Sequence, residues 1–278
     1  YFGTTHISTL NTSLFAAWRL AISGRWFSTA PIMLSLAAGP LSASATPRTA
    51  LLLHGSGGSA GAFVGRGAAK FIYACKGRYR DGGPDAWEFE ALDADIVGGA
   101  RSAGCGAWWT YPAGQRSFTA DSYEGDLESI CAVEAALEAG RIPALVGFSQ
   151  GAMLAAIVAA RAALGESSVP LSCLQLVVCC GGAMPNPHAP LLRRLRETSP
   201  PSLVPTLHCL SKVDRINPPE QGEALAACFG ATAEVLWHDG GHVMPPRPQL
   251  LEAAEFLDRH WRVGGRPASA AEEEITMF

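Results

Sequence analysis

The chain has 278 residues, of which 48% are hydrophobic and 17% charged, and its formal net charge is −4. This length can bury the core of one large α/β domain or of two small ones, and the composition is that of an ordinary globular protein. The negative charge and the lack of any Lys/Arg run exclude nucleic acid as the default partner.

Residues 1–47 differ in composition from the rest of the chain. The first 50 residues contain three Arg but no Asp or Glu, and they are rich in Ser, Thr and Ala. This composition is typical of a transit peptide for a plastid or mitochondrion. The stretch PIMLSLAAGPL followed by SASA also fits a secretory signal peptide, and a disordered extension of a cytoplasmic protein is the third interpretation. Pro31 and Pro40 leave too short an apolar run for a membrane span of about 20 residues.

The remaining chain alternates short apolar runs with amphipathic, helix-like stretches. The expected strands are 49–55, 87–97, 143–148, 174–180, 205–210 and 233–238. The expected helices are 60–77, 122–140, 151–165, 219–230 and 247–261. This order predicts an α/β fold, with a mostly parallel sheet covered by helices on both faces. We expect one α/β domain over residues 48–263, followed by a solvated tail over 264–278.

The segment 98–122 follows neither the helix period nor the strand period. Long irregular insertions inside compact domains are usually functional or disordered, and the bulky Trp108, Trp109 and Tyr111 argue against disorder. We expect this segment to cross the top of the sheet. The alternative is a loop whose tryptophans simply pack on the nearest helix.

The eight cysteines do not form a recognisable disulfide or metal pattern. No Cys-x-x-Cys pair occurs, and Cys173, Cys179, Cys180 and Cys209 lie in apolar, strand-like runs where a free thiol packs as a small hydrophobic group. We therefore expect reduced cysteines and no zinc site.

The stretch TALLLHGSGGSAGAF, residues 49–63, is an apolar strand that ends in a glycine-rich loop. Gly55, Gly57 and Ala60 match the Gly-x-Gly-x-x-Ala spacing of a dinucleotide site, but such a site needs an acidic residue about 20 positions later, and IYACKGRYR contains none. A hydrolase instead uses a loop here to supply a backbone N–H to an oxyanion. On that reading Ser56 or Gly57 is the donor.

Residues 147–151 read Gly-Phe-Ser-Gln-Gly, the Gly-x-Ser-x-Gly pattern of a nucleophile elbow. The apolar run PALVGF leads directly into Ser149, and GAMLAAIVAA begins a helix directly after it. We expect the two glycines to be required because side chains would clash in so tight a turn. The Gln150 N–H at the helix N-terminus would then be the other oxyanion donor.

A serine nucleophile needs a base and an acid, which follow it in chain order in this fold. The run AEVLWHDGGHVMPP offers His238 and His242, and we favour His242 because it lies in a flexible loop past the last strand. For the acid, Asp214 follows the preceding strand, whereas Asp239 lies too near His242 in sequence to hold its ring.

These motifs make the chain resemble the FSH-type serine hydrolases, a branch of the α/β-hydrolase superfamily. The likeness rests on LLLHG, AWWTY with SYEGDLESI, VGFSQGAMLAA, PTLHCLSKVDRINPPEQGEALAACF and HDGGHVMP, and it covers residues 49 to about 247. The resemblance implies a triad of Ser149, Asp214 and His242, no cofactor, and Trp108 and Trp109 lining the acyl pocket. Ser56 stands where the family often has a bulky residue, and CCGG replaces its usual Ser-Gly.

The sequence thus predicts a serine hydrolase that cleaves carboxylic esters or thioesters through an acyl-enzyme. Its partner would be a small acyl substrate. Three alternatives remain open: a thioesterase acting on acyl-CoA or an acyl carrier, a non-catalytic ligand-binding homologue, and a dinucleotide-binding oxidoreductase.

Overall fold

The computed structural model describes residues 48–77, 86–94, 106–168, 170, 172–200 and 203–262, all within one compact unit, Ser44–Phe278. The extension 1–47, the tail 264–278 and part of the insertion 98–122 lie outside the described residues. The proposed domain limits therefore stay predictions.

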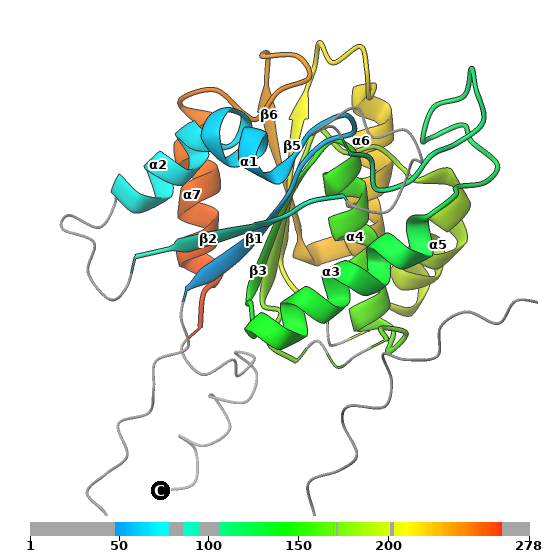
Figure 1. Cartoon of the computed structure of the whole chain (residues 1–278), viewed down its shortest axis with the longest axis horizontal. Helices are drawn as coiled ribbons and strands as arrows, with labels where there is room; N and C mark the ends of the chain where they lie inside the picture. The colour runs from blue at the N-terminus through cyan, green and yellow to red at the C-terminus, as the bar shows by residue number, and fades with distance from the viewer. Residues whose placement is uncertain are drawn as a thin grey trace, which may run out of the picture. The chain divides into compact units, whose positions relative to one another are not determined.

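A six-stranded, fully parallel sheet forms the centre of the described chain (Figure 1). Its strands are β1 (Thr49–Leu53), β2 (Glu88–Leu92), β3 (Ala144–Phe148), β4 (Leu176–Cys180), β5 (Thr206–Ser211) and β6 (Ala233–His238). Their order is β2-β1-β3-β4-β5-β6. β1, β4 and β5 are buried along their whole length because helices cover both faces, so these strands read as continuous apolar runs.

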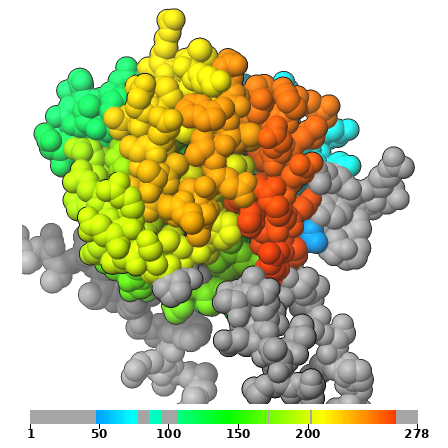
Figure 2. Space-filling view, turned by 180° about the vertical axis from the view of Figure 1, so that it is seen from behind, coloured from blue at the N-terminus to red at the C-terminus, as the bar shows by residue number. Residues whose placement is uncertain are grey.

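The helices divide between the two faces of the sheet (Figure 1). One buried cluster joins the sheet to α3 (Asp126–Gly140), α4 (Gln150–Ala163), α5 (Ala189–Thr198) and the α6 (Pro219–Ala226) and η3 (Ala227–Thr232) segment. The other joins it to α2 (Ala69–Gly77) and α7 (Gln249–His260). Seen from behind, the yellow-to-red segments that include α6, η3, β6 and α7 lie side by side over the surface (Figure 2).

The structure confirms the predicted α/β architecture and corrects several elements. The helix expected over 60–77 is broken into α1 (Ala60–Ala62), a π-helical turn η1 (Phe63–Gly67) and α2. The strand expected over 87–97 ends at Leu92, and residues 95–97 lie outside the described residues. A short turn, η2 (Asn186–His188), and helix α5 were not anticipated.

No helix in the described ranges is long and apolar enough to span a bilayer. Each cysteine in the same ranges is a free thiol.

His208 of β5 is expected to make the protein less stable in mild acid. Its side chain is buried, and burial lowers the pKa of this imidazole to about 4. Between that pH and the ordinary value of about 6.5, the unfolded chain binds a proton that the folded chain does not, so stability falls as pH falls through this window. The loss amounts to about 3 kcal/mol across the whole window.

Urea unfolding of the parent and of His208→Gln at pH 7 and pH 4.5 measures this contribution. We expect stability to decline with acid by about 2–3 kcal/mol less in the variant, because its side chain has no titratable proton. Equal declines in the two proteins would contradict the assignment.

Candidate active site

Three loops that follow β3, β5 and β6 meet at one edge of the sheet. Because all six strands are parallel, their carboxyl ends point to the same edge, where open α/β sheets bind ligands. Ser149 follows β3, Asp214 follows β5 and His242 follows β6. The predicted residues are thus brought to one place from positions far apart in the chain.

Ser149 occupies a strained turn between β3 and α4. Its backbone has φ 54° and ψ −116°, which a non-glycine residue rarely adopts. A Cβ on Gly147 would lie 2.2 Å from the Gly151 carbonyl oxygen, and a Cβ on Gly151 would lie 2.3 Å from that of Leu53. Both glycines are therefore required by close backbone packing, as the sequence pattern predicts.

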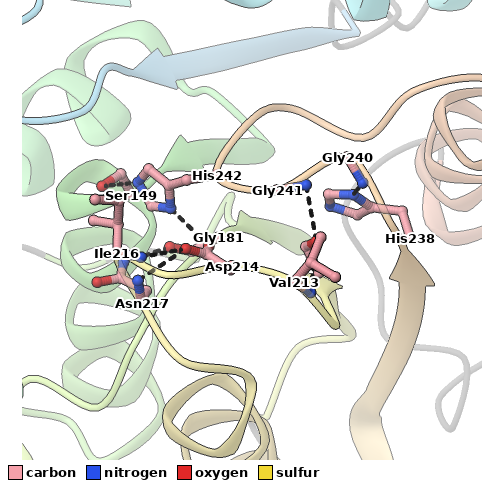
Figure 3. Close-up of polar contacts among 11 residues, drawn as sticks. Ser149, Gly181, Val213, Asp214, Ile216, Asn217, His238, Gly240, Gly241 and His242 are labelled. Atoms are coloured by element: carbon pink, nitrogen blue, oxygen red, sulfur yellow. Dashed lines mark hydrogen bonds and ion pairs between the residues drawn. The ribbon is translucent and has the colours of Figure 1, made fainter.

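The three polar side chains form a continuous hydrogen-bonded chain (Figure 3). His242 Nδ1 lies 2.7 Å from Asp214 Oδ2, and His242 Nε2 lies 2.8 Å from Ser149 Oγ. The Asp214 carboxylate can only accept hydrogen bonds, so the neutral imidazole carries its hydrogen on Nδ1. Nε2 is then the acceptor for the serine hydroxyl. This geometry is that of a serine nucleophile paired with a base and an orienting acid.

Asp214 is held in place by its own loop. The side chain is buried, and Oδ1 accepts hydrogen bonds from the backbone N–H groups of Ile216 and Asn217 at 2.8 and 3.0 Å. The Asn217 side chain in turn donates to the Gly181 carbonyl at 2.6 Å, which ties the loop to the end of β4. Asn217 was not predicted as part of the site, because one Asn in a turn carries no signal of its own.

His242 packs against two neighbours that the sequence analysis did not assign, Phe148 and Gly181. The Phe148 ring lies 5.0 Å from the imidazole, centroid to centroid. Gly181 has φ 59°, and a Cβ there would lie 3.4 Å from His242 Cε1 and 3.6 Å from Phe148 Cε2. This glycine, the first in CCGG, permits a left-handed turn close to the imidazole.

His238, the alternative base, shapes the loop instead. Its Nδ1 accepts a hydrogen bond from the Gly240 N–H at 3.1 Å (Figure 3). Burial lowers the pKa of His238, against the opposing charges of Asp214 and Asp239, and so favours the neutral imidazole that can accept this bond. The Gly241 N–H donates to Ser211 Oγ at 3.0 Å, which fixes the turn just before His242.

The loop after β1 is a tight turn in which the Ser56 N–H donates to no group among the described residues. The Gly58 N–H donates to the Gly55 carbonyl at 3.1 Å, Gly57 has φ 75°, and Ser56 is not among the residues with positive φ. These features define a type II turn with Ser56 at its second position. The Gly57 N–H already donates to the Gly106 carbonyl at 2.9 Å. The assignment of Gly57 as an oxyanion donor is therefore corrected, and Ser56 remains the candidate.

Gln150 has two separate functions in the structure. Its backbone N–H opens helix α4 beside Ser149, where the first N–H groups of a helix lack partners within the helix. Its buried side chain accepts from the Trp108 N–H and donates to the Trp109 carbonyl, each at 2.9 Å. The side chain thus holds the insertion against the start of α4.

Trp108 and Trp109 lie in the hydrophobic core, and neither lines the cavities described below beside Ser149 and His242. Their exposed fractions are 0% and 1%. Trp108 Nε1 donates to the His54 carbonyl at 2.7 Å, and Trp109 stacks on Tyr123 with ring centroids 4.7 Å apart. The prediction that they line the pocket is corrected: Tyr111, from the same insertion, lines the cleft at Ser149.

Two adjoining cavities flank the line from Ser149 to His242. A cleft of about 290 Å³ contains Ser149 and is lined by Gln150, Tyr111, Arg116 and Asn217 among others. A larger cavity of about 610 Å³ lies between the loop after β1, the first helical segments and the loop after β6. Both are bordered by Gly55, Ser56, Phe148 and His242.

The parallel sheet, the strained elbow and the hydrogen-bonded Ser-His-Asp chain together define a serine hydrolase with the α/β-hydrolase fold. The family model described as serine hydrolase (FSH1) matches residues 45–254. The chain therefore belongs to the FSH1 serine hydrolase family. The dinucleotide-binding interpretation of the first loop is superseded by this membership.

Curated relatives carry the name esterase. Esterase OVCA2 of Mus musculus is 31% identical over 180 residues, covering 63% of this chain and 68% of the relative. Esterase OVCA2 of Danio rerio is 35% identical over 159 residues, covering 55% and 67% respectively. Esterase C25G4.2 of Caenorhabditis elegans is 32% identical over 166 residues, covering 55% of this chain and 72% of the relative.

Solved structures share the fold at low sequence identity. The crystal structure of esterase PE8 has a TM-score of 0.56 at 23% identity, covering 78% of this chain and 94% of that one. The crystal structure of SOBER1 of Arabidopsis thaliana has a TM-score of 0.56 at 18% identity, covering 77% of this chain and 99% of that one.

Proposed function

We propose that the protein is an esterase that cleaves carboxylic esters or thioesters through an acyl-enzyme on Ser149. The observation that carries the proposal is the hydrogen-bonded chain from Asp214 through His242 to Ser149. The esterase names of the curated relatives support the same reaction class.

In the proposed reaction, His242 Nε2 takes the hydroxyl proton as Ser149 Oγ attacks the acyl carbon. Asp214 stabilises the resulting imidazolium, and His242 then gives the proton to the leaving alcohol or thiol. A water molecule, deprotonated by His242, next attacks the acyl-enzyme and releases the acid. The thioesterase alternative follows the same steps with a thiol as leaving group.

A fluorophosphonate probe followed by peptide mapping tests this proposal on the full chain. We expect one covalent adduct on Ser149, because only a serine activated by a base reacts readily with the probe. Turnover of an aryl ester should disappear in step with labelling. A folded protein that neither reacts nor hydrolyses any ester or thioester would instead support a non-catalytic homologue.

Replacing Ser56 with proline is expected to lower kcat by about 10²–10³-fold while changing KM little. Proline is favoured at the second position of a type II turn, so it removes the Ser56 N–H and leaves the backbone path intact. The loss arises because the tetrahedral oxygen keeps only the Gln150 N–H as a donor.

Ser56→Ala is the matched control, because it removes the hydroxyl but keeps the N–H. We expect near-parental kcat for this variant in steady-state ester hydrolysis. If the proline and alanine variants had equal kcat values, the second donor would have to be another group.

A further inference from the structure

Apart from histidine, the charged side chains that line the two cavities described beside Ser149 and His242 are cations. Arg116 lines the cleft that contains Ser149, and Arg66 and Lys70 line the larger cavity beside it. A third cavity of about 480 Å³ is lined by Lys70 and Arg247. This bias runs against the composition, since the chain has 25 acidic and 21 basic residues.

The larger cavity and the third one adjoin each other at a shared wall, and together they outline a path that leads away from His242. Lys70, Pro246 and Leu250 line both of them. The part near His242 is walled by apolar side chains, among them Phe63, Phe148 and Met244. In Figure 1 the loop after β6 lies beside α1 and α2, the elements that contribute to the wall of this cavity. The path therefore begins at the base, continues over apolar surface and ends among cations.

These cations lack ion-pair partners within the described residues. Arg161, Arg194 and Arg259, on other parts of the surface, are each paired with a glutamate. No such pair engages Arg66, Lys70, Arg116 or Arg247 in the ranges that the structure describes. Charges of one sign that line a cleft focus the potential there and attract ligands of the opposite sign.

We propose that the substrate carries an anionic group at the end of an apolar arm. The arm occupies the cavity of about 610 Å³, a size typical of small-molecule sites, and the anion contacts Lys70, with Arg66 and Arg247 lining the same path. This inference rests on the proposed esterase function and specifies its substrate class.

Two sources of this chemistry fit the path. In one, the acyl chain ends in a carboxylate, as in a monoester of a long dicarboxylic acid. In the other, the leaving group carries phosphate, as in an acyl-CoA. Hydrolysis is the same in both: Ser149 displaces the leaving group with cleavage of the C–O or C–S bond, and the leaving group takes the serine proton through His242. Water then cleaves the acyl-enzyme, and its proton returns to Ser149 through His242.

Matched substrate pairs test the proposal in the full-length protein. The first pair compares the aryl monoester of a long dicarboxylic acid with the aryl ester of the fatty acid of equal length. The second compares an acyl-CoA with the acyl-pantetheine, which lacks the phosphates. We expect kcat/KM to favour the anionic member of one pair by about tenfold at low salt, and the preference to shrink in 0.5 M NaCl because salt screens exposed charges.

The double variant Arg66→Gln/Lys70→Gln should lose most of this preference. Lys76→Gln is the matched control, because Lys76 is exposed on the same helix and lines none of the three cavities. A preference confined to the first pair assigns the anion to the acyl chain, and one confined to the second assigns it to the leaving group.

Two results would overturn the inference: no charge preference in either pair, or a preference that the double variant retains in full. Either result leaves the proposed esterase function standing, provided that the neutral esters are hydrolysed. Failure of the esterase function is distinguishable, because it would abolish turnover of every substrate and the fluorophosphonate adduct as well.

Discussion

The Asp214→Asn variant is expected to hydrolyse esters with kcat reduced by about 10⁴-fold. Asp214 Oδ1 accepts two backbone N–H groups, from Ile216 and Asn217, so an asparagine must keep its amide oxygen there. Its NH₂ group then faces His242 Nδ1 and can only donate to it. The imidazole hydrogen is forced onto Nε2, which can no longer accept the proton of Ser149.

Steady-state kinetics on an aryl ester, together with thermal unfolding, measures this effect. The melting temperature should stay close to that of the parent, because the asparagine preserves the shape and the backbone contacts of the loop. Asp239→Asn is the matched control: Asp239 is exposed beside the same loop, and we expect less than about a twofold change in kcat. A loss below tenfold for Asp214→Asn would show that the acid does not set the tautomer of His242.

Replacing Ser149 with alanine is expected to give the largest loss, about 10⁶-fold in kcat. The variant removes the only atom that hydrogen-bonds His242 Nε2 among the described residues, and with it the atom that forms the acyl-enzyme. Alanine tolerates φ 54° about as well as serine does, so the elbow should persist. Residual turnover would then come from the oxyanion donors acting on water.

Ser117→Ala provides the comparison, because Ser117 lines the same cleft as Ser149. We expect the fluorophosphonate adduct to form on the Ser117 variant and to be absent from the Ser149 variant. Adduct formation on the Ser149 variant would identify a different nucleophile and contradict the mechanism. The turnover of the Ser149→Ala variant should be compared with the uncatalysed reaction in the same buffer.

That Ser149, Asp214 and His242 lie together could be predicted because each one follows an apolar strand. β3, β5 and β6 are recognisable as apolar runs, and parallel strands bring their following loops to one edge. The position of His242 in the loop past β6 then distinguishes it from His238, and Asp214 is distinguished from Asp239 because Asp239 lies too near His242 in sequence. The hydrogen bonds at 2.7 and 2.8 Å agree with that choice.

What could not be predicted depends on contacts between distant segments. The bond from the Gly57 N–H to the Gly106 carbonyl decides which residue of the first loop keeps a free donor, and no local pattern reveals it. The burial of Trp108 and Trp109 likewise depends on the side chain of Gln150. Helix α5 was not predicted from the sequence because it is short and rich in Arg. Only Ala189, Leu192 and Leu195 are buried along it.

The order in which the site residues occur also governs when activity can appear during synthesis. Ser149 and His242 are 93 positions apart, and Asp214 lies between them. At ribosomal rates of about 5–20 residues per second, the nucleophile emerges roughly 5–20 s before its base. A growing chain therefore exposes a serine that is not yet activated by a base. The chain becomes a hydrolase only when β6 and the loop after it have folded onto the sheet.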